Sequence, residues 1–208
     1  MGNNLPIAKN GIKFICTSLF MMVLFWLFGC GKVAFLALAV SIFFIFVFRN
    51  PERERLFFED SSVLSPVDGV LSDVVEDEQK DEYILTIQNS CLNVALLRSP
   101  FDATIKTIEL VRGARVSPAS KLFDKLNENA TLVFTNKNEQ SIKINHRLKQ
   151  TIKSIDIDTK VGNKLFQGSR YGFALNNTTT IYLPRSFRLN INIGDELRAG
   201  ESLVGYFS

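Results

Sequence analysis

The hydrophobic pattern divides the chain into an almost uncharged N-terminal part and a longer part that alternates apolar runs with polar turns. Two apolar segments, residues 14–28 and 33–48, flank Gly29-Cys30-Gly31-Lys32, whose glycines can end a helix and reverse the chain. Each segment of about 15 residues would form a helix of roughly 23 Å, shorter than the roughly 30 Å hydrocarbon core of a bilayer. The pattern predicts a helical hairpin that spans the membrane or re-enters it.

Basic residues bracket this hairpin and predict its topology. Lys9 and Lys13 precede the first segment, and Arg49, Arg53 and Arg55 follow the second. Positive charge at both ends predicts that both lie in the cytoplasm, so residues 1–55 are interpreted as an anchor and basic linker in the inner (cytoplasmic) membrane. A cleaved signal peptide is the alternative, but it would have one shorter apolar core and a small-residue cleavage site. The three arginines are also candidate ligands for anionic lipid headgroups, although they could serve only as topology signals.

Residues 56–208 predict a mainly β domain. Short runs rich in β-branched and aromatic residues are separated by turn residues, and several alternate apolar with polar side chains, which indicates one buried and one solvated face. A short helix is expected at residues 120–127. The expected strands are residues 69–75, 83–87, 92–97, 104–111, 130–135, 140–145, 151–156, 179–183 and 187–193.

The turns favour a compact β barrel or sandwich. Asp68-Gly69 near the start of the domain and Gly194-Asp195 near its end place Asp and Gly where strands reverse. Lipoyl and biotinyl carriers share such paired turns, but they need a lysine at a hairpin tip, and no suitable lysine is found in these turns. The carrier interpretation is therefore disfavoured.

Composition removes several classes of function. The 24 basic and 21 acidic side chains nearly balance, so there is no strong field to attract nucleic acid. The three cysteines have neither a disulfide pattern nor metal-ligand spacing, and a single histidine gives little support for a zinc site. Membrane phospholipid is the expected partner, and no metal is expected.

Together, several short motifs make the chain resemble the short-form phosphatidylserine decarboxylase family over nearly its whole length. Each motif is weak alone, and their shared order and spacing carry the resemblance. The motifs are Phe48-Arg49-Asn50-Pro51-Glu52-Arg53, Ser65-Pro66-Val67-Asp68-Gly69, Arg98-Ser99-Pro100-Phe101-Asp102-Ala103 with Gly113, Asn127-Glu128-Asn129, Arg170-Tyr171-Gly172, Ile181-Tyr182-Leu183-Pro184, and the closing turn at residues 194–200.

The resemblance implies a specific chemistry. Members of this family are proenzymes that cut themselves at a Gly-Ser bond, and the serine becomes a pyruvoyl group that acts as an electron sink during decarboxylation. An aspartate and histidines assist by proton transfer. The aspartate corresponds to Asp68, which is retained, although an aspartate that caps a turn would account for it equally. The resemblance also implies a homodimer.

The remaining catalytic positions of the family are altered in this sequence. Ala95 stands where the resemblance implies a histidine, and Arg98 stands where longer members have a second one; neither can act as a base. Counting back from Tyr182, the Gly-Ser pair falls on Asn176-Asn177.

An asparagine cannot become a pyruvoyl group. Thr178 or Thr179 could attack its own carbonyl, but residues 176–180 are equally consistent with a polar hairpin turn. Gly168-Ser169 is a Gly-Ser pair, but it precedes Arg170-Tyr171-Gly172 and is interpreted as a turn. His146, the only histidine, is expected at the surface near a strand end.

Two functions follow from this comparison. The favoured one is a non-catalytic, membrane-anchored relative that acts as a lipid-associated module and needs no cofactor. The alternative is an active decarboxylase that converts phosphatidylserine to phosphatidylethanolamine with a pyruvoyl group, which the retained family pattern and Asp68 favour. An intact chain or a chain cut near Asn177 would separate the two.

Overall fold

The computed structural model describes residues 5–53 and 59–207 and divides into two compact units, residues 1–52 and 53–208. The domain boundary therefore falls directly before Arg53, which belongs to the second unit together with the strands. Arg55, one of the arginines considered for lipid binding, lies outside the described residues.

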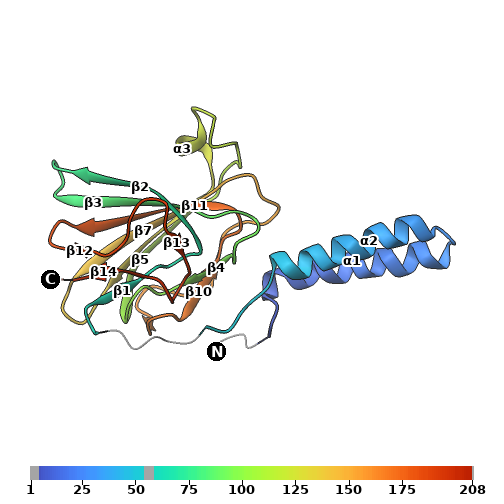
Figure 1. Ribbon diagram of the computed structural model, residues 1–208, viewed down its shortest axis with the longest axis horizontal. Helices are drawn as coiled ribbons and strands as arrows, with labels where there is room; N and C mark the ends of the chain where they lie inside the picture. Colours follow the sequence, from blue (N-terminus) through green and yellow to red (C-terminus); the bar gives the residue numbers. More distant parts are fainter. Residues whose placement is uncertain (1–4, 54–58, 208) are drawn as a thin grey trace. The chain divides into compact units, whose positions relative to one another are not determined.

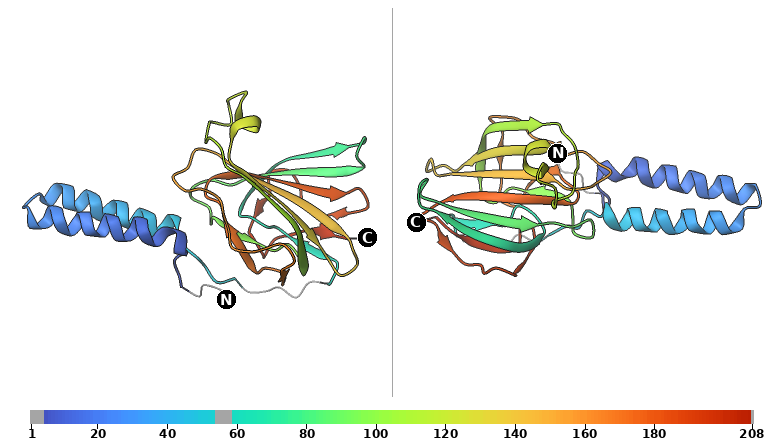
Figure 2. Two further views of the ribbon diagram at one scale, coloured as in Figure 1. Left: turned by 180° about the vertical axis from the view of Figure 1, so that it is seen from behind. Right: turned by 90° about the horizontal axis from the view of Figure 1, so that it is seen from above.

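The first unit is a hairpin of two antiparallel helices, α1 (Lys9–Leu27) and α2 (Gly31–Val47), shown side by side in Figures 1 and 2. Both helices begin earlier than the apolar segments suggested, because the polar residues before each segment continue its first turn. By length and composition, α1 could cross a membrane, whereas α2 is apolar but shorter. The helices meet through a buried hydrogen bond of 2.8 Å from Ser41 Oγ to Ser18 Oγ and through a cluster of Phe14, Phe44 and Phe48.

The second unit is mainly β, as predicted. Its largest sheet has eight strands in the order β13-β2-β3-β11-β7-β6-β5-β9 and does not close into a barrel. Two three-stranded sheets, β1-β14-β12 and β4-β10-β8, complete the domain. The strands are β1 (Ser62–Leu64), β2 (Gly69–Asp77), β3 (Glu82–Gln88), β4 (Leu96–Arg98), β5 (Ala103–Val111), β6 (Asn129–Thr135), β7 (Ser141–Leu148), β8 (Asp156–Ile157), β9 (Lys164–Leu165), β10 (Arg170–Phe173), β11 (Asn177–Pro184), β12 (Arg188–Leu189), β13 (Glu196–Leu197) and β14 (Leu203–Tyr206).

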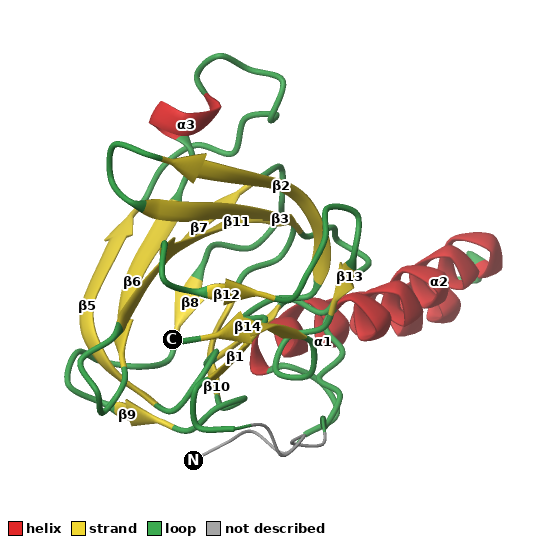
Figure 3. Cartoon of the chain, turned by 60° about the vertical axis from the view of Figure 1, so that its left-hand side comes forward, coloured by secondary structure: helices red, strands yellow, loops and turns green. Residues whose placement is uncertain are grey.

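Alternating side chains bury one face of the large sheet. In β7, Ile142, Ile144, His146 and Leu148 are buried, whereas Ser141 and Lys143 on the opposite face are exposed. The large sheet curves around β1, β14 and β12, and its inward side chains pack with Val63 and Val204 of these strands (Figure 3). This packing gives the domain one continuous apolar core.

Three expected strands and the expected helix are corrected by the structure. Residues 151–156 alternate in polarity but contribute only Asp156 to β8, because Thr151, Ser154 and Ile155 are hydrogen-bonded to side chains of Arg115 and Glu128. The expected strand at residues 187–193 is reduced to β12, and that at residues 92–97 to the start of β4. The expected helix is shortened to α3 (Phe123–Leu126).

Candidate functional site

The register of the large sheet places one residue from each of six strands in a row at one end of the sheet. Val70, Gln88, Thr178, Arg147, Asn129 and Val111 form a single row across β2, β3, β11, β7, β6 and β5. Residues 89–95, 112–128, 149–155 and 174–176 leave the sheet beyond this row, and we call this end the site edge. Because neighbouring strands lie about 4.8 Å apart, residues distant in sequence become neighbours here.

Asn89 connects three of the segments singled out from the sequence. Its backbone N–H donates to the carbonyl oxygen of Asn177 at 2.9 Å. Its side-chain Nδ2 donates to the carbonyl oxygens of Asp68 at 2.8 Å and Val94 at 3.3 Å. The neighbouring carbonyl of Ala95 accepts the N–H of Ala174 at 2.8 Å. The fold therefore brings together Asp68, Ala95 and the Asn176-Asn177 pair.

Asp68 is engaged in a buried ion pair. Its two carboxylate oxygens accept hydrogen bonds of 2.7 Å each from Nη1 and Nη2 of Arg53, and Oδ1 also accepts the backbone N–H of Ala199 at 2.8 Å. Arg53 Nη1 also donates to the Ala199 carbonyl at 2.7 Å. The side chains are only 7% and 10% exposed for Arg53 and Asp68, respectively. This guanidinium, considered above as a lipid ligand, is thus occupied within the β domain.

The histidine expected at the surface is fully buried, and that expectation is wrong. His146 Nδ1 lies 2.8 Å from Thr179 Oγ1, and Nε2 lies 2.7 Å from the Tyr171 hydroxyl. The single hydroxyl proton of Thr179 is donated to Asn177 Oδ1 at 2.8 Å, so Nδ1 must carry the imidazole proton and donate it to Thr179. Tyr171 then donates to Nε2, and Asn177 Nδ2 donates to the Ala174 carbonyl at 2.7 Å.

Burial keeps this chain of hydrogen bonds neutral. Removal of His146 from water lowers its pKa from 6.5 to about 3, because the charged imidazolium is poorly solvated in the core. The same burial raises the pKa of the Tyr171 hydroxyl well above 10. At neutral pH, therefore, the imidazole is uncharged, and both of its nitrogens are already hydrogen-bonded.

The turn before Asn177 has an unusual backbone. Asn176 adopts a positive φ of 52°, in the left-handed region that glycine and asparagine tolerate best. Its Nδ2 donates to the Gln150 carbonyl at 2.7 Å. Beside it, Thr178 Oγ1 donates to Gln88 Oε1 at 3.0 Å, and Lys149 Nζ donates to the same oxygen at 3.3 Å. Partial burial lowers the pKa of Lys149.

Of the other singled-out arginines, Arg98 lies beside the turn that carries Asp68, and Arg49 belongs to the helical hairpin. Arg98 is buried on β4, its backbone N–H donates to the Pro66 carbonyl at 2.9 Å, and its Nη1 donates to the Gly168 carbonyl at 2.9 Å. Arg49 lies at the end of the hairpin, where its guanidinium stacks on Phe46 at 4.2 Å from the ring centroid and donates to the Phe46 carbonyl at 3.0 Å. The guanidinium that binds the Asp68 carboxylate is that of Arg53.

Sequence reasoning missed the roles of Asn89, Tyr171 and His146. A signal for His146 was present, because it follows Ile142 and Ile144 at a spacing of two residues and so points to the same buried face of β7. Nothing comparable marked Asn89, whose three partners lie in segments that only the folded chain assembles.

Comparison with known proteins identifies the family. The phosphatidylserine decarboxylase family model matches residues 40–205. The chain belongs to this family. It is 27% identical to the phosphatidylserine decarboxylase proenzyme of Desulfotalea psychrophila, with 96% of each chain covered. It is 28% identical to that of Geotalea uraniireducens, with 97% of each chain covered, and 26% identical to that of Ehrlichia chaffeensis, with 96% of this chain and 91% of the relative covered. No solved structure matches it.

Within the decarboxylase family, a pyruvoyl group would have to arise from a residue of the chain itself. Asn177, which counting back from Tyr182 aligns with the family's serine, has an amide and no hydroxyl, and both polar atoms of that amide are hydrogen-bonded. Thr179 has a hydroxyl but lies in the regular pairing of β11 with β3 and β7, without the strained turn that self-cleavage requires. The side chains present therefore do not fit formation of the group, and we derive no step through it.

Proposed function

We propose that this chain is a non-catalytic, membrane-anchored member of the phosphatidylserine decarboxylase family that acts as a lipid-associated module. The observation that carries the proposal is the state of Asn177. Its side chain is fixed between the Ala174 carbonyl and the Thr179 hydroxyl, in the place where the family needs a serine nucleophile.

The surrounding groups also lack the properties of an acid or a base. The carboxylate of Asp68 is neutralised by Arg53, Ala95 has no ionisable group, and His146 is buried with its pKa lowered to about 3. A general base works best when its pKa lies near the working pH and when it can reach the substrate. The carboxylate of Asp68 is held in its ion pair, Ala95 cannot transfer a proton, and the lowered pKa of His146 lies far below neutral pH.

The anchor would be the hairpin of α1 and α2. The apolar length of α1 and the basic residues beside it, Lys9, Lys13 and Arg49, support placement in the inner membrane with the β domain in the cytoplasm. Arg49 lies at the end of the hairpin, where a guanidinium would reach the headgroups of anionic phospholipids. Membrane phospholipid is therefore the partner that we propose.

An active decarboxylase is the second candidate. It is favoured by the retained Asp68 and by coverage of almost the full length of relatives named as proenzymes. In this candidate, Thr178 or Thr179 would have to replace the missing serine.

Intact-mass spectrometry of the purified protein tests the choice. We expect one chain of 23.4 kDa. A matched variant that restores the family residues, with Ala95→His, Asn176→Gly and Asn177→Ser, serves as the positive control for self-cleavage. A native chain that is itself split, with a carbonyl-blocked fragment beginning between Asn177 and Thr179, would overturn the proposal in favour of the enzyme.

A further inference from the structure

The loops at the site edge carry exposed apolar side chains. Leu122 and Leu126 on the α3 segment are 50% and 46% exposed, and Ile152 on the neighbouring loop is 54% exposed. Figures 1 and 3 show α3 standing away from the sheet. Exposed leucine and isoleucine at the tips of projecting loops are costly in water unless another surface covers them.

These loops also carry an excess of positive charge. Residues 112–128 and 149–155 together contain six basic and two acidic side chains. Both acids are already neutralised: Asp124 pairs with Arg147, and Glu128 pairs with Arg112 and Arg115. Lys121 and Lys125 directly precede the two exposed leucines, and Lys153 follows Ile152. The charge available at this surface is therefore cationic.

The projecting segment is held in place by buried polar contacts. Asn127 accepts the N–H of Val116 at 3.0 Å and donates to the carbonyls of Val116 at 2.9 Å and Leu148 at 2.7 Å. Arg115 reaches across to the Thr151 carbonyl at 3.0 Å and Ser154 Oγ at 2.6 Å. These bonds tie the leucine-bearing loop to the loop of Ile152. A pre-organised surface loses less entropy when it binds.

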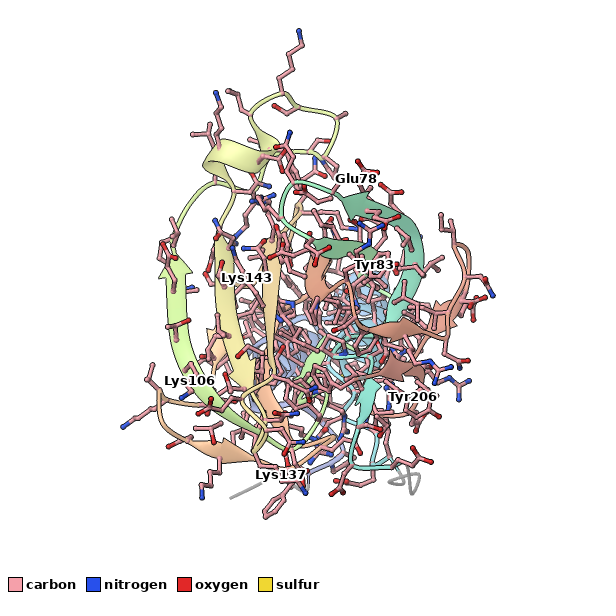
Figure 4. All side chains as sticks on the ribbon, turned by 90° about the vertical axis from the view of Figure 1, so that its left-hand side faces the viewer. Glu78, Tyr83, Lys106, Lys137, Lys143 and Tyr206 are labelled. Atoms are coloured by element: carbon pink, nitrogen blue, oxygen red, sulfur yellow. The ribbon has the colours of Figure 1, made fainter. Side chains whose placement is uncertain are left out.

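The opposite end of the sheet has a different character. The turn between β2 and β3, residues 76–82, contains five acidic residues and one lysine, and the turn between β6 and β7, residues 136–140, is wholly polar. Figure 4 is viewed toward this end, with Glu78 and Lys137 labelled there. Phe166 and Val161 are exposed near β9, but Asp60 pairs with Lys137 and Asp102 accepts the N–H of Gln167 in the same region. Among the described residues, exposed Val161 and Phe166 near β9 also lie close to lysines, Lys160 and Lys164, but the site edge carries three exposed apolar tips that are each adjacent in sequence to a lysine.

We propose that the site edge is a lipid-docking surface, in which Leu122, Leu126 and Ile152 enter the interfacial region of an anionic bilayer while Lys121, Lys125 and Lys153 contact its headgroups. This inference rests on the proposed membrane anchoring, because a tethered β domain stays within reach of the bilayer. Apolar burial and attraction between lysines and acidic lipids act together at such a surface. Docking would place the Asn89 and Asn177 region against the lipid.

Depth-dependent quenching of fluorescence in the full chain tests the proposal. Cys16, Cys30 and Cys91 are replaced by serine, and a single fluorophore is attached at Leu122→Cys or, as the matched control, at Phe166→Cys. The protein is reconstituted into phosphatidylcholine vesicles with or without phosphatidylserine, and acyl-chain nitroxide lipids serve as quenchers. We expect strong quenching at position 122 in the phosphatidylserine vesicles and little at position 166.

Two further measurements make the outcome decisive. Lys121→Gln with Lys125→Gln should lower the docked-to-undocked ratio by on the order of 30-fold, because each basic residue near an anionic surface contributes about a fivefold factor. Equal quenching at positions 122 and 166 would overturn the proposal. A spectral shift at position 122 without lipid quenching would also overturn it and would indicate a protein partner, such as a second copy. Flotation of the same samples reports the anchor separately, so loss of docking is distinguishable from loss of anchoring.

Discussion

Two buried polar clusters contain residues that the sequence aligned with the family's catalytic groups. Their polar atoms find hydrogen-bond partners in different ways. In the charged cluster, Asp68 is paired with Arg53 through two hydrogen bonds. In the neutral cluster, Tyr171, His146, Thr179 and Asn177 form one uninterrupted chain of hydrogen bonds. The comparison shows that a charged pair and a neutral chain of hydrogen bonds can both satisfy polar side chains inside this domain.

The charged cluster should be the more costly of the two to break. Asp68→Ala removes the two short hydrogen bonds to the buried guanidinium of Arg53 and leaves it with the longer ion pair from Nε to Glu201 at 3.9 Å, so we expect a loss of about 3 kcal/mol in the free energy of unfolding. Thermal unfolding of the full chain in detergent, followed by circular dichroism, measures the loss. The double variant Arg53→Met with Asp68→Leu should recover much of it, because no charge is then buried.

A surface pair provides the control for this experiment. Asp60 and Lys137 form an ion pair with both side chains exposed, and their hydrogen bond, with the charge attraction, lowers the pKa of Asp60 and raises that of Lys137. Asp60→Ala should leave stability unchanged within error, because solvent screens exposed pairs. Equal effects of Asp60→Ala and Asp68→Ala would contradict the distinction between buried and exposed charge.

The neutral cluster should respond to acid. His146 has a folded-state pKa of about 3, below its ordinary value of 6.5, so the unfolded chain takes up the proton first as the pH falls. Its contribution is therefore complete above pH 6.5 and is lost progressively toward pH 3, with a slope of up to about 1.4 kcal/mol per pH unit. At pH 5 the expected loss is about 2 kcal/mol.

His146→Gln isolates this contribution, since carboxylates also titrate at low pH. The variant is expected to be less stable at pH 7, but its stability should fall less steeply between pH 6.5 and 5 than that of the native chain. Parallel pH profiles for the two proteins would show that the imidazole is accessible to protons in the folded state.

The sequence predicted the elements of the fold better than the contacts of the site. Alternation and apolar length located both helices and strands such as β2, β5 and β11, because an element with one buried face has apolar residues at regular intervals in its sequence. The strands β9 and β13 have two residues each and leave no such record. The loop at residues 151–155 alternates without being a strand, because its backbone is held by Arg115 and Glu128 from a distant segment.

For the site, the family pattern indicated which positions would meet, but not how their atoms would be satisfied. Asp68 could be aligned from its turn motif, whereas its partner Arg53 was assigned to the membrane linker, since proximity across 15 positions is a property of the fold. His146 was placed at the surface because Asn145 and Arg147 flank it, yet alternation puts neighbours on opposite faces. Local sequence patterns cannot predict which polar side chains become hydrogen-bond partners when tertiary packing buries them.

The link between His146 and Asn177 should contribute less to stability than the charged cluster does. Thr179→Val removes the one hydroxyl that serves both residues and leaves a buried N–H and a buried carbonyl without partners, so we expect a loss of about 1–3 kcal/mol. Thr180→Val, one position along β11 on the more exposed face, is the matched control and should change stability little. Chemical denaturation of both variants measures the difference, and a larger loss at Thr180 would contradict the proposed network.

The smallest expected effect concerns the turn that enters the neutral cluster. Asn176→Ala and Asn176→Gly both remove the side-chain hydrogen bond to Gln150. The difference between their free energies of unfolding therefore measures the cost of the backbone conformation at this position. With φ at 52°, alanine should be less stable than glycine by about 1 kcal/mol, because only the alanine side chain is strained in the left-handed region. Paired thermal melts measure this difference. A glycine variant no more stable than the alanine variant would show that the turn relaxes out of the left-handed region. The turn shape would then depend on the hydrogen bond that the asparagine side chain donates to the Gln150 carbonyl.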